Sequence, residues 1–195
     1  MIFERPGHNR AMDDPVIRDA TAADFPRIVA LNAAEVAHTS VMDTARLAVT
    51  GGSYAGYLVA WIVGHDKRFK AACAQRGVYD LRTFFGEGNA WRLVPNYFGG
   101  YPWDKETYAN LERESPINYV QNVTTPIIIF HGENDLRTGV IQSEQYYRSL
   151  KVLGRTVEYV RHPGGTHELT RSGNNRQRID QMLRTYEFFE RFIQH

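Results

Sequence analysis

The stretch LAVTGGSYAGY, residues 47–57, predicts a strand, a tight turn and a helix in immediate succession. Apolar and β-branched residues lead into a serine between small residues, and an unbroken apolar run follows. In a G-x-S-x-G turn of this kind, the serine side chain is held exposed above the end of its strand, where it acts as a nucleophile. We therefore predict that Ser53 is a nucleophile.

The composition is typical of a globular protein with a single hydrophobic core. The chain has 195 residues, of which 43% are hydrophobic and 12% aromatic, so we expect one sizeable core with an appendage. Its 23 Lys and Arg residues nearly balance 22 Asp and Glu residues, which leaves a net charge of +1. Because no strong field of either sign results, we expect a small or neutral substrate, no nucleic acid and no membrane.

A single cysteine and a polar N-terminus predict a cytoplasmic protein. Cys73 has no second cysteine with which to pair and stands among alanines, which favours a buried, unreactive thiol in a reducing compartment. Residues 1–7 contain no apolar signal region. The most apolar run, Tyr57–Val63, is far shorter than the ~20 residues needed to span a bilayer.

From Asp43 onward, strands and helices alternate. The predicted strands are residues 46–50, 69–74, 126–130 and 156–161, and the predicted helices are residues 54–64, 140–153 and 175–194. This alternation predicts an α/β fold, with a mostly parallel sheet of about four strands and helices on both faces. The last helix has an apolar stripe that we expect to dock on the sheet: Ile179, Met182, Leu183, Tyr186, Phe189 and Ile193. The aromatic-rich residues 79–123 predict short helices and loops that cover a substrate pocket. Core packing is the alternative, and for any one of these aromatic residues it is the more frequent role.

Three residues with complementary chemistry follow three of the predicted strands. Ser53 follows the first, Asp135 lies in HGENDL (131–136), and His167 lies in PGGTHEL (163–169). Functional residues of a parallel sheet gather at the carboxyl ends of its strands. A serine hydroxyl needs an imidazole to accept its proton, and the imidazole needs a carboxylate that orients it and stabilises its charge. The order Ser, Asp, His is that of the α/β-hydrolases.

Each of these three residues also has a purely structural interpretation. Ser53 alone could cap a helix, Asp135 could belong to a turn, and His167 could be a surface histidine. Their joint occurrence in this order, each just after a predicted strand, favours catalysis over the separate structural roles.

A metal or phosphate site is a weaker alternative. The available ligands have no spacing typical of a zinc site: His131, Glu133, His162 and His167. Residues 51–53 lack the lysine that follows in a phosphate-binding loop, and no dinucleotide fingerprint occurs. We therefore expect no metal and no cofactor.

Four segments together resemble one known family. They are TGGSYAGY (50–57), WIVGHDKRFKAACAQR (61–76), TPIIIFHGENDLR (125–137) and GRTVEYVRHPGGTHEL (154–169). Residues 44–193 resemble the C-terminal half of the catalytic α/β-hydrolase domain of the prolyl oligopeptidase family, near its acylaminoacyl-peptidase branch. The resemblance implies that Ser53 is the nucleophile, Asp135 the orienting acid and His167 the base. It also implies that the backbone N–H of Tyr54 is an oxyanion donor and that Arg76 lines the substrate pocket.

Two departures from the family pattern affect the expected activity. Ala55 stands where the family usually has glycine, and its methyl group adds a minor strain that leaves the turn intact. The strands and the oxyanion loop that precede the nucleophile strand in the family are absent from this sequence, so we expect a truncated α/β-hydrolase fold with an unpaired edge on the 46–50 strand. We expect the 15–20 strand, or the same strand of another copy in a homo-oligomer, to cover that edge.

The N-terminal residues predict a separate segment. Residues 15–20 are predicted to form a strand, and a capped helix is predicted after it. The segment IRDATAADFPRIVALNAAEVAHTSVMD (17–43) resembles the opening of the acyl-CoA-dependent N-acetyltransferases. We therefore divide the chain into an appendage, residues 1–43, and a partial hydrolase domain, residues 44–195.

Three functions are compatible with these features. The first is a serine hydrolase that cleaves peptide, acyl-peptide or ester bonds through an acyl-enzyme on Ser53. The second is a truncated or fused remnant that keeps the fold for stability or oligomerisation without catalysis. The third is an N-acetyltransferase, which is disfavoured because the pyrophosphate-binding loop of that superfamily does not occur in the sequence.

Overall fold

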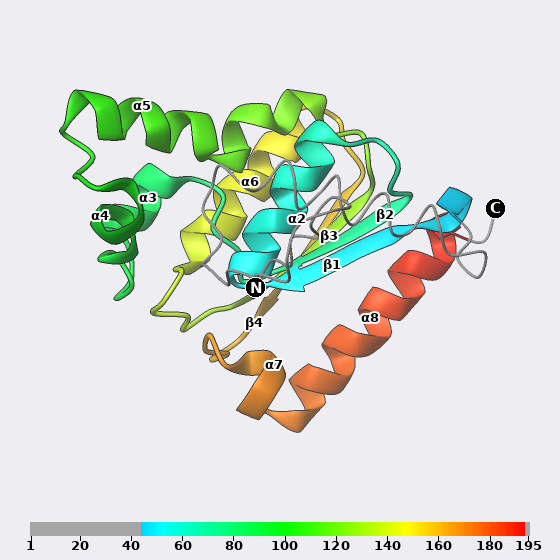
Figure 1. The fold of residues 1–195 in the computed structure, drawn as a ribbon. Helices are drawn as coiled ribbons and strands as arrows, with labels where there is room; N and C mark the ends of the chain where they lie inside the picture. The colour runs from blue at the N-terminus through cyan, green and yellow to red at the C-terminus, as the bar shows by residue number, and fades with distance from the viewer. Residues whose placement is uncertain (1–43, 194–195) are drawn as a thin grey trace, which may run out of the picture. The chain divides into compact units, whose positions relative to one another are not determined.

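The computed structural model describes residues 44–193 (Figure 1). The predictions made for residues 1–43 lie outside the described residues, namely the 15–20 strand, the helix after it and the acetyltransferase-like segment. None of the helices between residues 44 and 193 combines the length and the apolar character that crossing a bilayer requires.

A parallel sheet of four strands forms the centre of the fold. The strands lie side by side in chain order: β1 (Ala48–Gly52), β2 (Ala71–Gln75), β3 (Ile127–Gly132) and β4 (Val157–His162). The predicted α/β class and parallel sheet are therefore confirmed. The register pairs Gly52 with Gln75 and Gly132 with His162, so the carboxyl ends of the strands lie along one edge of the sheet.

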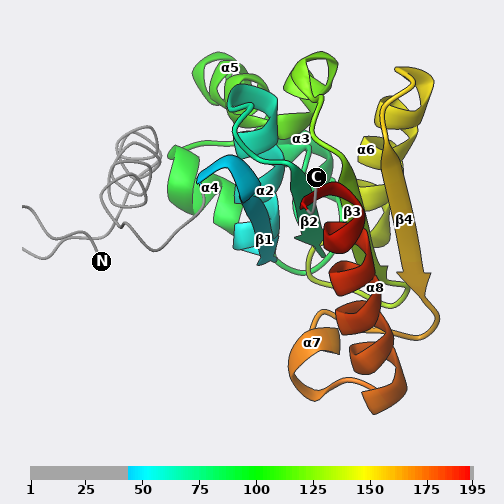
Figure 2. The ribbon, with the colours of Figure 1, turned by 90° about the vertical axis from the view of Figure 1, so that its right-hand side faces the viewer.

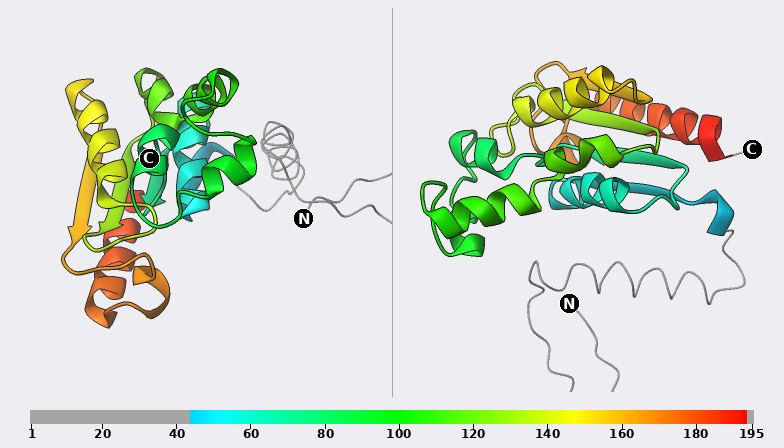
Figure 3. Two further views of the ribbon diagram at one scale, coloured as in Figure 1. Left: turned by 90° about the vertical axis from the view of Figure 1, so that its left-hand side faces the viewer. Right: turned by 90° about the horizontal axis from the view of Figure 1, so that it is seen from above.

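Helices cover both faces of this sheet (Figures 2 and 3). They are α2 (Tyr54–His65), α3 (Leu81–Gly86), α4 (Leu93–Phe98), α5 (Lys105–Glu114), α6 (Val140–Val152), α7 (Leu169–Ser172) and α8 (Asn175–Ile193), with the 3₁₀ segments η2 (Thr44–Arg46) and η3 (Pro116–Asn122). The segments α2, α6 and η3 pack on one face, and α8 packs on the other. Right-handed connections explain this division, because strands added in one direction place their crossover helices on the same face.

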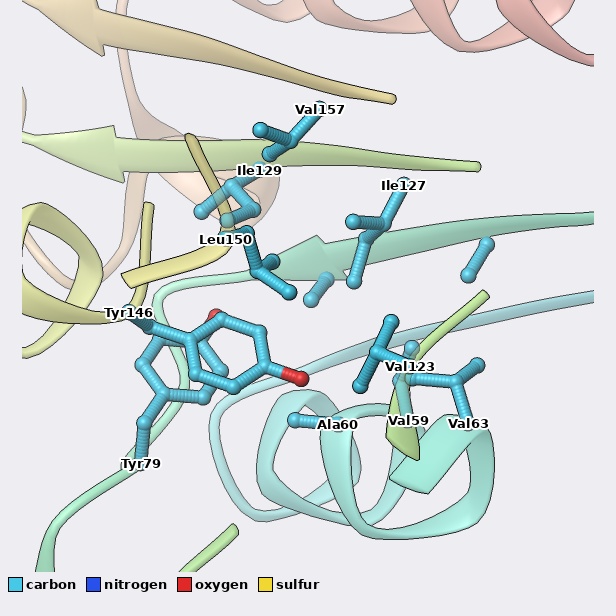
Figure 4. Packing of buried hydrophobic residues seen from close by; sticks show 12 residues of the cluster. Val59, Ala60, Val63, Tyr79, Val123, Ile127, Ile129, Tyr146, Leu150 and Val157 are labelled. Atoms are coloured by element: carbon cyan, nitrogen blue, oxygen red, sulfur yellow. The ribbon is translucent and has the colours of Figure 1, made fainter. Parts of the chain in front are cut away.

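Side-chain alternation along the strands separates two apolar cores. Ile127 and Ile129 of β3 face α2 and α6, where the rings of Tyr79 and Tyr146 stack with centroids 4.5 Å apart (Figure 4). Ile128 points the opposite way, toward α8. Because β3 lies between β2 and β4 and is covered on both faces, every one of its residues is buried.

The strand β1 lies two residues further along the chain than predicted. Residues up to Arg46 form η2, so the predicted start of the strand is wrong. The strand continues instead through Gly51 and Gly52. A Cβ on Gly51 would lie 2.5 Å from the carbonyl oxygen of Ala55, and one on Gly52 would lie 3.2 Å from Nη2 of Arg76. The two glycines therefore let α2 and Arg76 pack closely on opposite faces of the strand end.

The predicted docking stripe of α8 is wrong over much of its length. Four of its members are more than half exposed: Ile179, Met182, Leu183 and Tyr186. The last two members, Phe189 and Ile193, do pack against the sheet, and the helix also turns Phe188 and Phe192 toward it, beside Ala71 and Cys73. An apolar stripe identifies one surface of the helix. The fit of side chains to the sheet decides how the helix is rotated about its axis. Here Phe188 and Phe192 fill the space over the small side chains of Ala71 and Cys73.

The single cysteine is buried, as predicted. Cys73 has no exposed surface, and its Sγ lies 3.5 Å from Oγ1 of Thr185 in α8. Burial raises the pKa of its thiol, which disfavours the reactive thiolate. The cytoplasmic location stays a prediction.

Residues 79–123 form short helices, as predicted: α3, α4, α5 and η3. The helices α3 and α4 lie beyond the carboxyl ends of the strands (Figure 1). A separate apolar cluster holds α3, α4 and α5 together: Val78, Leu81, Phe84, Val94 and Leu111. That these segments cover a substrate pocket stays a prediction.

Candidate active site

A sharp turn centred on Ser53 joins β1 to α2. The Ser53 backbone has φ 63° and ψ −122°, a region that residues with side chains rarely occupy and that costs of order 1–3 kcal/mol. The Ser53 N–H donates to the carbonyl oxygen of Gln75 over 2.9 Å. A Cβ on Gly56 would lie 2.6 Å from the same oxygen. The close approach of α2 to β2 therefore requires glycine at this position and supports the strained serine.

The structure brings together the three residues that the sequence singles out. Ser53 follows β1, Asp135 follows β3, and His167 follows β4. The Oγ of Ser53 lies 2.9 Å from Nε2 of His167, and Nδ1 of His167 lies 2.8 Å from Oδ2 of Asp135. Both distances are hydrogen-bond distances. The three side chains are thus linked one to the next by hydrogen bonds, and we call them the Ser53–His167–Asp135 hydrogen-bond chain.

Asp135 is held by donors from several directions. The backbone N–H groups of Arg137 and Thr138 donate to its Oδ1 over 2.8 and 3.1 Å, and the Thr138 hydroxyl donates to its Oδ2 over 3.0 Å. Burial opposes the charged form, but hydrogen bonds from His131, His167 and the Thr138 N–H outweigh it and hold the pKa of Asp135 well below its usual value. The carboxylate is therefore ionised and ready to stabilise a cationic His167.

The depressed pKa of Asp135 predicts that the fold loses stability in acid. A carboxyl with a lower pKa in the folded state stabilises the fold above its unfolded pKa of about 3.9, and this contribution is lost as the pH falls through the folded value. We expect the free energy of unfolding to decrease below about pH 4, by up to about 1.4 kcal/mol per pH unit from this group. Urea unfolding at several pH values measures the slope. Asp135→Asn should flatten it, and equal slopes in the two proteins would contradict the prediction.

The backbone N–H of Tyr54 lies at the start of a helix. Tyr54 is the first residue of α2, so its N–H has no carbonyl partner within the helix. The N-terminal end of a helix also carries a partial positive charge. That this N–H is an oxyanion donor stays a prediction.

Arg76 lies beside the same strand ends but is buried. Its backbone has φ 41°, and its guanidinium lies against Gly52 and donates from Nη2 to Oγ1 of Thr170 over 2.7 Å. Its Nε and Nη1 are buried without a hydrogen-bond partner among the described residues. Burial and the charge of Arg171 lower its pKa. Arg76 therefore has two nitrogen atoms free to bind an acceptor.

Comparison with known proteins assigns the chain to a family. The model of the prolyl oligopeptidase family matches residues 7–195. The chain belongs to this family. Uncharacterized peptidase YuxL of Bacillus subtilis is 36% identical over 155 residues, which are 78% of this chain and 23% of that protein. Dipeptidyl-peptidase 5 of Porphyromonas gingivalis is 33% identical over 133 residues, 65% of this chain and 19% of that protein.

A solved structure matches the fold of this prolyl oligopeptidase family chain. The acylaminoacyl peptidase of Pyrococcus horikoshii superposes with a TM-score of 0.80 at 28% identity, over 88% of this chain and 28% of that protein. The sheet therefore corresponds to part of the α/β-hydrolase domain of acylaminoacyl peptidases. The chain spans about a quarter of the length of YuxL and of the Pyrococcus enzyme.

The family match bears on the N-terminal segment, and the structure bears on Ala55. The match begins at residue 7 and so includes most of the segment that resembles N-acetyltransferases, and no comparison supports an acetyltransferase part. At the turn, Ala55 is exposed at the start of α2, and its close neighbour on β1 is Gly51, which has no side chain. The expected minor strain leaves the helix α2 intact from its first residue.

Sequence reasoning missed two residues of this family site. Thr138 bonds to Asp135, and its position three residues later is a turn signal that could have indicated it. His131 was considered only as a metal ligand, yet its Nε2 lies 3.3 Å from Oδ2 of Asp135. Within residues 44–193, no group of three or more His, Cys, Asp or Glu side chains is arranged to hold a metal ion.

A glycine contact ties the loop that carries His167 to β3. A Cβ on Gly132 would lie 2.4 Å from the carbonyl oxygen of Gly165, so Gly132→Ala must push this loop away. We expect Gly132→Ala to slow labelling of Ser53 by a serine-reactive fluorophosphonate about 100-fold, because a displacement near 1 Å costs that much. Gly86→Ala is the control, since a Cβ there would meet nothing within 4 Å. Equal labelling rates of the two variants would contradict the prediction.

Proposed function

We propose that this chain is a serine hydrolase of the prolyl oligopeptidase type, which cleaves peptide, acyl-peptide or ester bonds through an acyl-enzyme on Ser53. The observation that carries the proposal is the Ser53–His167–Asp135 hydrogen-bond chain, in which Ser53 Oγ lies 2.9 Å from His167 Nε2 and His167 Nδ1 lies 2.8 Å from Asp135 Oδ2. Its residues have the roles that acyl transfer requires: Ser53 is the nucleophile, His167 the base and Asp135 the orienting acid.

The reaction proceeds in two halves. Ser53 Oγ bonds to the substrate carbonyl carbon while its proton moves to Nε2 of His167, and the Asp135 carboxylate stabilises the resulting imidazolium. The Tyr54 N–H donates to the carbonyl oxygen as that oxygen becomes negative. The bond to the leaving amine or alcohol then breaks, and His167 returns the proton to it. Water attacks the Ser53 ester, gives a proton to His167, and the acid leaves with Ser53 restored.

The names of the relatives support an acylated or short peptide as the substrate class. They include an acylaminoacyl peptidase and a dipeptidyl-peptidase. We propose that Arg76 binds a substrate oxygen through Nε or Nη1, because both atoms lack a partner among the described residues. In Arg76→Met, a peptide substrate should protect Ser53 from the probe about tenfold less well, which is the loss of one charge-assisted hydrogen bond. Unchanged protection would reject this role.

The rate of peptide turnover depends on how many oxyanion donors the chain presents. Tyr54 supplies one, and the loss of one such donor slows a hydrolase by about 10²–10³. Labelling by a reactive phosphonate is therefore a better test than peptide turnover, because the probe needs an activated serine but little transition-state stabilisation.

The decisive experiment is incubation with a fluorophosphonate followed by intact-mass spectrometry. We expect one adduct per wild-type chain and none in Ser53→Ala. Ser172→Ala, in an exposed serine at the end of α7, is the matched control and should be labelled like the wild type. A folded wild-type chain that acquires no adduct would favour the second candidate, a non-catalytic remnant of the fold.

We also propose a division of the chain into two parts, and a partner for the edge of β1 that is unpaired within the described sheet. Residues 1–43 form an appendage to the hydrolase segment 44–195, and β1 pairs with another copy in a homo-oligomer. The supporting observation is that β1, within the described sheet, pairs with β2 alone. Light scattering across a concentration series tests it: a single mass near 22.4 kDa at every concentration would reject the homo-oligomer.

A further inference from the structure

A second buried histidine lies beside Asp135, and the reaction described above does not use it. His131 lies near the end of β3 and has no exposed surface. Its Nε2 lies 3.3 Å from Oδ2 of Asp135, the same oxygen that faces His167. Its Nδ1 lies 2.6 Å from Oγ of Ser143 in α6, which is equally buried. Both nitrogens of the ring therefore have a polar partner.

The partners of His131 decide which of its nitrogens carries the proton. The carboxylate of Asp135 can only accept, so Nε2 must be the donor. In a neutral ring Nδ1 is then the acceptor, and the Ser143 hydroxyl donates to it. The opposite tautomer would direct a nitrogen lone pair at a carboxylate oxygen, and the low dielectric of the interior strengthens that repulsion. Oγ1 of Thr138 also lies 3.5 Å from Nε2, but its hydroxyl donates to Oδ2 of Asp135 over the shorter distance of 3.0 Å. The tautomer with its proton on Nε2 therefore satisfies every group.

We propose that Ser143 and His131 extend the catalytic chain to Ser143–His131–Asp135–His167–Ser53, with His131 as a positioning residue that acts through Asp135. This inference rests on the proposed hydrolase function. His131 restrains Oδ2 on the line to Nδ1 of His167. The Nε2–H of His131 also stabilises the negative charge of the Asp135 carboxylate. This stabilisation keeps the proton on His167 rather than on Asp135 during the reaction.

The other charged groups near this cluster come from neighbouring segments. Arg76 at the end of β2 and Glu87 after α3 both act on Asp135 through their charges. Tyr79 faces the same core from the segment after β2, and burial raises the pKa of its phenol, so it stays neutral. Substitutions at His131 leave these groups unchanged, and their effects can be attributed to the donor that is lost.

Nuclear magnetic resonance of chains with ¹⁵N-labelled histidine tests the hydrogen-bond chain directly. We expect the proton of the neutral His131 ring to lie on Nε2, since moving it to Nδ1 would remove the hydrogen bond to Asp135. Ser143→Ala should move the Nδ1 resonance of His131 and leave that of His162 in place. A proton on Nδ1 of His131 in the wild type would overturn the inference without any variant.

Two substitutions separate positioning from packing. His131→Phe keeps a buried ring but removes the donor to Asp135, so Oδ2 of Asp135 loses one of the hydrogen bonds that hold it in place. We expect the fluorophosphonate labelling rate to fall about tenfold. His131→Gln restores an N–H at a similar reach, and its labelling rate should return to within about twofold of the wild type.

His162→Phe is the matched control for these changes. His162 is a buried histidine at the end of β4, and it stacks on Phe130 rather than contacting Asp135. Its substitution should leave the labelling rate unchanged. If His131→Gln and His131→Phe slow labelling equally, or neither slows it, His131 only fills space and the inference fails. A wild-type chain that forms no adduct would instead reject the hydrolase function, whatever the histidine spectra show.

Discussion

Asp135→Asn is expected to lower the rate of fluorophosphonate labelling of Ser53 by about 10⁴. The amide replaces an acceptor with a group that can donate, so it favours the tautomer of His167 whose proton is on Nε2 and points at Ser53. That tautomer cannot accept the serine proton. The imidazolium also loses its counter-charge at 2.8 Å. The rate of adduct formation, followed by mass spectrometry at constant pH, measures the effect.

A second aspartate provides the control for this substitution. Asp180 forms an exposed ion pair with Arg184 one turn away on α8. Asp180→Asn should label within about twofold of the wild type, because exposed ion pairs contribute at most about 1 kcal/mol. A loss of less than tenfold in Asp135→Asn would mean that the carboxylate does not orient His167, and the proposed roles would have to be revised.

Ile128→Ala is expected to destabilise the fold by about 2–5 kcal/mol. Ile128 is fully buried in β3, on the face of the sheet that α8 covers. Truncation removes apolar surface from the core and leaves a cavity, which β3 cannot close because its neighbouring strands hold it on both sides. Urea unfolding followed by circular dichroism gives the free energy of unfolding.

Ile179→Ala is the matched control at an exposed position. Ile179 belongs to the apolar stripe of α8 but is 53% exposed. Its truncation should change the free energy of unfolding by no more than about 0.5 kcal/mol, as for most surface substitutions. If Ile179→Ala proves as costly as Ile128→Ala, the stripe packs against something, and the rotation of α8 described here is wrong.

Much of the fold could be predicted because its signals are local. The unbroken apolar run that becomes β3 and the apolar run that becomes α2 each identify an element without reference to the rest of the chain. Parallel order then follows from their alternation, and it places the residues after β1, β3 and β4 at one edge. Ser53, Asp135 and His167 could be grouped for this reason, although they are far apart in the chain.

The errors arose where the answer depends on a contact between distant residues. The stripe of α8 contains real apolar side chains, but Phe188 and Phe192 fit the small residues of β2 and so set the rotation of the helix. The strand β1 ends at Gly52, two residues later than predicted. Ala55 and Arg76 pack against Gly51 and Gly52, where a side chain would collide with them. Neither neighbour can be inferred from the strand's own sequence.

Residue order alone therefore accounts for the elements, the parallel sheet and the choice of Ser53, Asp135 and His167, because apolar periodicity and turn chemistry act over a few residues. Three-dimensional packing alone decides the 2.8 and 2.9 Å contacts among them and the rotation of α8. It also places His131 between Ser143 and Asp135. Distances of this kind are set when separate elements come together in one core, where each side chain must fit neighbours that lie far away in the chain.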